Sequence, residues 1–213
     1  MDIREYNTKA LPYHFVLFYE IPNEKLLVFG REINMSLKDN AVLTYCYLDS
    51  ECGLSYKVIC PARKKGDEIS YHIQENITTA VTLREGALEC QAIVIDEDDQ
   101  SVEQFKEEVD MIKKCYGYHL DSIDVSDEDP FSEFRHPAYP NDILVNFMSP
   151  NHKIEKMWVT QKDIREDGAV VAQLINEPYN ALMGVHEGDL VEIYPLKGED
   201  GETIPIAILS WMK

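Results

Sequence analysis

Short apolar segments broken by turn residues run along most of this chain, and their spacing is typical of β-strands. The clearest case lies at 54–60, where Leu54, Tyr56, Val58 and Cys60 occupy alternate positions. A strand with one buried face has this period of two. We predict further strands over 11–19, 25–29, 42–48 and 88–95, whereas 69–83 is compatible with either a strand or a helix.

One helix is predicted, over about 102–116. Its apolar residues fall on one face at helical spacing, namely Val102, Phe105, Val109, Ile112 and Tyr116. Ser101 and Gln104 form a capping-box pair at its start, and acidic residues crowd its first turns. Lysines in the last turn and Gly117 directly after it are typical of a helix end.

The chain changes character over 121–141. Its first nine residues contain five carboxylates and no base, and prolines follow at 130, 137 and 140. Such a segment has little apolar surface to bury and resists regular structure. We therefore predict an acidic connector that runs over the surface between two domains.

After the connector the pattern returns to short strands, over 143–148, 156–160, 169–175, 189–194 and 204–209. Asp167-Gly168 and Asp200-Gly201 are turn pairs typical of β-hairpins. The predicted fold class is therefore α+β, mostly antiparallel sheet with few helices. A β-rich domain over 1–120 ends with the helix, and a small β-rich domain occupies 142–213.

Charge narrows the possible partners. The 213 residues carry a formal net charge of -19, which disfavours nucleic acid and anionic membrane surfaces. A basic protein would be attracted, although the same charge also serves to keep a protein dissolved. No apolar run approaches the length of a membrane span, and the first residues lack a secretory pattern. Five cysteines, three of them in apolar segments, predict a reducing cytoplasm.

Familiar catalytic and metal-binding patterns are missing from the sequence. It has no Cys-x-x-Cys or His-x-x-x-His pair, no EF-hand loop, no Gly-x-Ser-x-Gly elbow and no glycine-rich phosphate loop. Cys46, Cys52 and Cys60 lie on neighbouring predicted segments, but thiols on a sheet are more often packing residues than metal ligands. We predict no metal and no cofactor, and the pattern favours a protein that is not an enzyme.

The best candidates for contact with a ligand or partner lie late in the chain. Pro178 and Asn176 are explained by a turn after a strand, whereas Glu177 and Tyr179 are not needed by that turn. His186 and Asp189 fall in the loop that follows. Trp158 lies within a predicted strand, either as a core aromatic or as the floor of a groove. Gly188-Asp189 is typical of a tight entry into a strand.

The last third resembles the YegJ-like bacterial domain of unknown function. The resemblance rests on Met157-Trp158-Val159, Asn176-Glu177-Pro178, Gly188-Asp189 and Trp211, in that order. The family tends to place an aspartate before the last tryptophan, and Ser210 stands there in this chain. The resemblance implies a small α+β or barrel-like domain at 142–213, and it implies no catalytic residues.

Three functions are compatible with these patterns. The leading hypothesis is a cytoplasmic protein-binding module with a basic partner, regulatory or analogous to a toxin-neutralising immunity protein. The second is a small-molecule hydrolase with a site between the two domains, with Glu177, Asp189 and His186 as its acids and bases. The third is a structural subunit of a larger assembly, for which an extended exposed apolar patch would speak.

Overall fold

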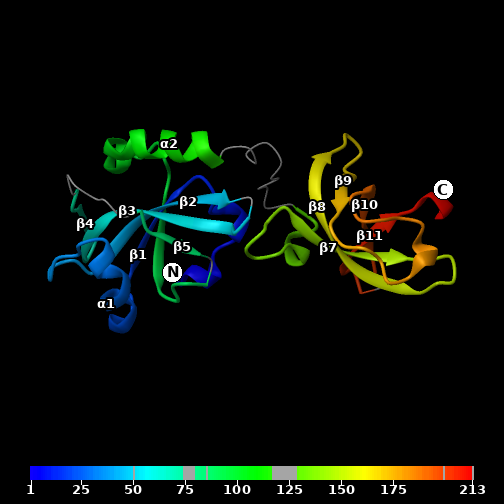
Figure 1. The fold of residues 1–213 in the computed structure, drawn as a ribbon, viewed down its shortest axis with the longest axis horizontal. Helices are drawn as coiled ribbons and strands as arrows, with labels where there is room; N and C mark the ends of the chain where they lie inside the picture. Colours follow the sequence, from blue (N-terminus) through cyan, green and yellow to red (C-terminus); the bar gives the residue numbers. More distant parts are fainter. Residues whose placement is uncertain (50, 74–79, 85, 117–128, 199, 213) are drawn as a thin grey trace. The chain divides into compact units, whose positions relative to one another are not determined.

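The computed structural model describes residues 1–49, 51–73, 80–84, 86–116, 129–198 and 200–212. The chain divides into two compact units, Met1–His119 and Leu120–Lys213, and Figure 1 shows the sheet of each. Each unit has its own hydrophobic core. The sheets are mostly antiparallel and only two α-helices accompany them in the described part of the chain. The predicted α+β class, β-rich in both units, is therefore confirmed.

The first unit is built on a six-stranded antiparallel sheet. Its main path runs β4-β3-β2-β1-β6, and β5 pairs with β3 beside this path. The strands are β1 (Phe15–Tyr19), β2 (Ala41–Asp49), β3 (Gly53–Lys65), β4 (Glu68–Tyr71), β5 (Thr82–Arg84) and β6 (Gln91–Ile95). Short 3-10 turns, η1 (Ile3–Glu5) and η2 (Thr8–Ala10), precede β1.

Helix α2 (Lys106–Tyr116) covers one face of this sheet, preceded by a 3-10 turn, η3 (Gln100–Phe105) (Figure 1). Its predicted apolar face is buried at Val102, Phe105, Val109 and Ile112. The predicted cap is wrong, because the helical turns begin at Gln100 and Ser101 already lies inside them. Asp99 is the N-cap instead, and its carboxylate accepts a hydrogen bond from the Ser101 amide at 2.8 Å. Gly117 lies outside the described residues.

The strand predicted at 25–29 is a helix, α1 (Asn23–Glu32). Both edges of β1 are already occupied, by β2 and β6. A strand formed by the segment after β1 would therefore have no free edge of β1 to pair with. The Pro22 carbonyl accepts from the amides of Lys25 and Leu26 at 2.9 and 3.0 Å, which opens the helix. The apolar run that suggested a strand is largely exposed, with Leu27 at 67% and Val28 at 75%.

The second unit is a closed barrel of five strands in the order β7-β8-β9-β10-β11. They are β7 (Asp142–Met148), β8 (Ile154–Ile164), β9 (Val170–Leu174), β10 (Leu190–Lys197) and β11 (Thr203–Ile208), with η5 (Ser132–Phe134), η6 (Ala181–Met183) and η7 (Ser210–Met212). All neighbours are antiparallel except β11 and β7, which close the barrel in parallel. The five strands predicted in this region are confirmed.

Inward positions of the barrel alternate as the sequence pattern indicates. Ile143, Val145 and Phe147 on β7 are buried, with Met157 and Val159 on β8. The turn pairs also behave as expected. Gly168 and Gly201 adopt positive φ at 81° and 79°, which a hairpin turn requires and glycine permits without strain.

The predicted connector differs from a surface linker in its described part. Residues 121–128 lie outside the described residues, whereas 129–141 pack within the second unit. Phe131 is fully buried in the barrel core. Arg135 and Asp129 form a buried ion pair at 2.8 Å, and the guanidinium also donates to the Pro140 carbonyl and the Gln161 side chain. The buried Phe131 ring and the Asp129–Arg135 ion pair therefore attach a mostly polar segment to the barrel.

No helix among the described residues combines the length and apolar character needed to cross a membrane.

Candidate functional site

The connection between β9 and β10, residues 175–189, brings together three of the predicted site residues. The Glu177 carboxylate contacts His186 Nδ1 at 2.7 Å through one oxygen and accepts the Glu187 amide at 2.9 Å through the other. The Asp189 carboxylate accepts the His186 amide at 2.8 Å. Glu177, His186 and Asp189 therefore cluster in one loop, which we call the barrel loop.

Tyr179 lies on the same loop, and its backbone is held by a residue outside the loop. Glu155, at the start of β8, accepts the amides of Tyr179 and Asn180 at 2.9 and 3.3 Å, one on each carboxylate oxygen. Asn180 in turn caps η6 by accepting the Leu182 amide at 3.1 Å. The backbone at Tyr179 is thus held on both sides, while its side chain is 100% exposed.

Both ends of the barrel loop are tied to the strands that it joins. The Gly188 amide donates to the Leu174 carbonyl at 2.8 Å, and Gln173 Nε2 donates to the Gly188 carbonyl at 3.1 Å. Gly188 has φ 93°, as its predicted role at a tight strand entry requires. Asn176 differs from its predicted role in the turn, because its side-chain oxygen accepts the Trp158 amide from the neighbouring strand.

Trp158 is a half-buried residue on the outer side of β8, since its neighbours Met157 and Val159 point inward. Its ring packs edge-on against His136 at 5.3 Å, and His136 packs against Tyr139 at the same distance. The backbone of Trp158 also receives the Ile175 amide at the start of the barrel loop. Trp158 thus supports the loop through its main chain, and its indole belongs to an aromatic cluster with residues 136–139.

Electrostatics of the barrel loop favour an ion pair in water. The Glu187 amide and the His186 side chain lower the pKa of Glu177 below its ordinary value, and the hydrogen bond to Glu177 raises the pKa of His186. Both side chains are open to solvent, at 56% and 75% exposure. A catalytic acid and base gain their strength from a site that excludes water. The Glu177–His186 pair is therefore better suited to holding the conformation of this exposed loop than to acid–base catalysis.

The barrel loop itself is negatively charged. Residues 175–189 contain three acidic residues, Glu177, Glu187 and Asp189, and no lysine or arginine. One exposed aliphatic side chain, Leu182 on η6 at 59%, lies three residues from Tyr179. Exposed aromatic residues of this kind are enriched at the contact surfaces of proteins.

A second acidic surface lies on the first unit, along residues 96–110. Eight carboxylates and one lysine give this stretch a net charge of -7. Glu97 is engaged by Lys113 at 2.6 Å and by the Tyr45 hydroxyl at 3.0 Å, whereas Glu103, Glu107 and Asp110 are exposed on η3 and α2. We call this stretch the acidic helix surface. Helix capping accounts only for the acidic residues at 96–99, and the negative charge continues along the helix to Asp110.

Three of the five cysteines are poorly placed for thiol chemistry. Cys46, Cys60 and Cys90 are buried, and burial raises the pKa of the Cys60 thiol to about 12. A thiol of that pKa holds its proton at neutral pH and is a poor nucleophile. Within the described ranges, no three His, Cys, Asp or Glu side chains are grouped so as to hold a metal ion.

The residues that sequence reasoning missed are Glu155 and Asn180. Glu155 lies 24 residues before Tyr179, whose amide it accepts, and only the pairing of β8 with its neighbours brings the two together. Asn180 follows Tyr179 directly, and an asparagine before a short helical turn is a recognised capping signal. That signal was available in the sequence.

Comparison of the chain with protein-family models, curated proteins and solved structures gives no match. The resemblance of 142–213 to the YegJ-like domain stays a prediction, so a function has to be argued from the geometry of these surfaces.

Proposed function

We propose that this chain is a protein-binding module for a basic partner, and that the barrel loop is its contact surface. One observation carries the proposal: a fully exposed tyrosine stands on a backbone that Glu155 and Asn180 hold in place. An aromatic side chain gains most on binding when its backbone is already ordered, since less conformational entropy is then lost.

The charge of the chain supports a basic partner. The barrel loop carries three carboxylates, Glu177, Glu187 and Asp189, and a cationic side chain placed over the Tyr179 ring would gain a cation–π contact. The acidic helix surface adds a second concentration of negative charge on the other unit. Charge of this kind accelerates encounter with a basic protein more than it raises the affinity.

The hydrolase alternative has less support. Glu177, His186 and Asp189 do lie together, but Glu177 and Asp189 accept backbone amides of the loop itself. These carboxylates are therefore occupied with holding the loop, and both Glu177 and His186 face solvent. A structural subunit would also present an exposed apolar surface, and we retain it as the alternative in which the partner is permanent.

A cytoplasmic location belongs to the same proposal. All five cysteines are free thiols, and two of them, Cys52 and Cys115, are exposed. Exposed thiols persist in a reducing compartment and are lost in an oxidising one.

Site-specific photocrosslinking tests this function. A photoreactive phenylalanine analogue replaces Tyr179 in one variant and Leu196 in a matched control, because Leu196 is also exposed but lies at the far end of β10. We expect cross-linked partners at position 179 that are basic proteins, absent at position 196. Their yield should fall when salt rises from about 50 mM to about 500 mM, since the Debye length shortens severalfold.

Three results would contradict the proposal: no adduct at position 179, the same adducts at both positions, or partners that are acidic and insensitive to salt. A third variant, Glu155→Gln, tests the order of the loop separately from the chemistry of Tyr179. It leaves Tyr179 in place but removes the charge and one of the two side-chain oxygens that accept loop amides, so it should weaken partner capture in the protein without the photoreactive residue.

A further inference from the structure

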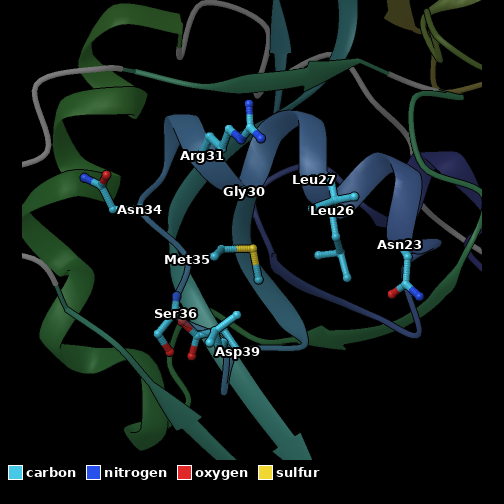
Figure 2. Close-up of a pocket in the computed structure, with 10 residues that line it drawn as sticks. Asn23, Leu26, Leu27, Gly30, Arg31, Asn34, Met35, Ser36 and Asp39 are labelled. Atoms are coloured by element: carbon cyan, nitrogen blue, oxygen red, sulfur yellow. Dashed lines mark hydrogen bonds between the residues drawn. The ribbon is translucent and has the colours of Figure 1, made fainter.

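A groove of about 660 Å³ lies beside α1, between the helix and the loop that follows it. Figure 2 shows Met35 between Arg31, on the helix, and Ser36 and Asp39, on the loop. This volume falls in the range of small-molecule sites, which extends from about 300 to about 1,000 Å³. The groove lies within the first unit and is unrelated to the barrel loop.

The groove has an apolar floor that the fold leaves uncovered. Leu26, Leu27, Met35 and Leu37 line it, and Leu27 and Leu37 are exposed to solvent. Gly30 allows the thioether of Met35 to lie directly on the helix, because a Cβ at this position would stand 3.3 Å from the sulfur. A flexible thioether against a bare helix backbone adapts readily to a bound chain.

Arg31 is the basic side chain among the residues that line the groove. Arg4, Arg84, Arg135 and Arg165 each pair with a carboxylate. Over the described ranges, no ion pair engages the guanidinium of Arg31 or that of Arg63, which lies on β3 outside the groove. Asp39 lines the same groove, but its carboxylate is buried and is held by His72 and by the Ser36 amide.

The groove stretch lacks the negative charge of the whole chain. Residues 23–39 contain three basic and three acidic side chains, a net charge of 0 in a chain of -19, and the Asp39 carboxylate among them is already held by His72 and the Ser36 amide. An unpaired guanidinium binds a carboxylate through paired, charge-assisted hydrogen bonds. The groove thus presents one basic side chain beside an apolar floor.

We propose that this groove binds a small amphipathic carboxylate, with its anionic group on Arg31 and its hydrocarbon chain along Leu26, Leu27 and Met35. The net charge decides in favour of a small ligand. An acidic protein or an anionic membrane would place many charges near a chain of -19. A monocarboxylate brings one charge, and charges farther than about 8 Å from it are screened at physiological ionic strength.

Fluorescence titration with cis-parinaric acid, a long-chain polyene carboxylate, tests the proposal on the full chain. We expect saturable binding at one site per chain, displaced by oleate. Arg31→Gln should weaken binding by about tenfold or more, since a charge-assisted contact is lost. Arg31→Lys should retain more affinity than Arg31→Gln, and Arg63→Gln is the matched control that should bind like the parent chain.

The apolar part of the groove is tested by two independent changes. Gly30→Ala keeps α1, since alanine favours a helix, but it displaces Met35 and should weaken binding of the probe. The methyl ester of the probe retains the chain and lacks the charge, so it should bind more weakly than the acid. Far-UV circular dichroism establishes that each variant retains its fold.

Absence of saturable binding to the parent chain overturns the proposal. So does an Arg31→Gln variant that binds as tightly as the parent, or an ester that binds as tightly as the acid. Each of these measurements is made on the first unit's groove, and none depends on whether the barrel loop binds a protein.

Discussion

Carboxylates on the barrel act mainly on backbone amides. Glu155, Glu177 and Asp189 each accept at least one main-chain N–H, and together they fix the loop from Glu177 to Asp189. An acidic side chain used in this way adds negative charge to the surface and also removes the conformational freedom of the loop. The same residues therefore supply both the order and the charge of the proposed contact surface.

The Glu177–His186 pair should be visible in a titration. We expect the pKa of His186 to exceed its ordinary 6.5 in the parent chain and to move back toward that value in Glu177→Gln. Nuclear magnetic resonance of the imidazole protons measures this shift. An unchanged His186 titration in the variant would show that the two side chains are not paired in solution.

Both groups must be charged for the pair to hold, which sets its pH window. Glu177 has a lowered pKa, so its contribution is present above the ordinary 4.5 and is lost as pH falls through the lowered value. His186 has a raised pKa, so its contribution is present below 6.5 and is lost as pH rises through the raised value. The barrel loop should therefore be best ordered between about pH 4.5 and 6.5.

At the scale of elements, alternation of apolar and polar residues predicted the barrel strands correctly, whereas a short apolar run without alternation led to a wrong prediction. Ile143, Val145 and Phe147 lie inside the barrel because a period of two fixes which face of a strand is buried. The run from Leu26 to Val28 carries no period, and a short apolar run is compatible with strand or helix. Only the pairing of β1 with β2 and β6 excludes a strand there.

The candidate site was predictable to the extent that its residues share one loop. Glu177, His186 and Asp189 are close in sequence, and the turn chemistry of Pro178 and Gly188 confines them to one connection. The role of Glu155 depends on a contact between segments that are distant in sequence. The groove beside α1 depends on a helix where the sequence pattern predicted a strand. Local patterns carry no information about such contacts, because register and packing are properties of the whole fold.

Substitutions in the Asp129–Arg135 ion pair test whether this pair attaches the segment 129–141 to the barrel. Arg135→Met leaves the Asp129 carboxylate buried without its partner, at a cost of about 3–5 kcal/mol. The double variant Arg135→Met with Asp129→Leu should regain most of that loss, since no buried charge remains. Urea unfolding followed by tryptophan fluorescence measures the second unit alone, because Trp158 and Trp211 are the only two tryptophans.

An exposed ion pair serves as the matched control for this experiment. Arg165 and Glu192 pair at 2.6 Å with side-chain exposures of 48% and 27%. Water screens such a pair, so Arg165→Met should cost at most about 1 kcal/mol. If Arg135→Met costs no more than Arg165→Met, the buried pair does not attach the segment to the barrel.

At the scale of the molecule, the negative charge is unevenly distributed. Residues 1–119 carry a net charge of -8, and the fifteen residues of the acidic helix surface account for -7 of it. The groove stretch, 23–39, is at 0. Solubility alone requires only a net charge away from zero and places no demand on its position. A charged docking surface requires concentration on particular elements, and the largest concentration lies on η3 and α2 of the first unit, whereas the barrel loop contributes Glu177, Glu187 and Asp189.

Two separate cores imply that the units respond separately to core substitutions. Leu43 is fully buried in the core of the first unit, and Leu43→Ala should cost about 2–5 kcal/mol. We expect faster hydrogen exchange in α2, while the urea midpoint of the tryptophan signal stays at its parent value. Val159→Ala in the barrel core should do the reverse, with a lower tryptophan midpoint and unchanged exchange in α2. A tryptophan midpoint that falls with Leu43→Ala would show that the two cores unfold as one cooperative unit, because a local change in one would then be felt by both.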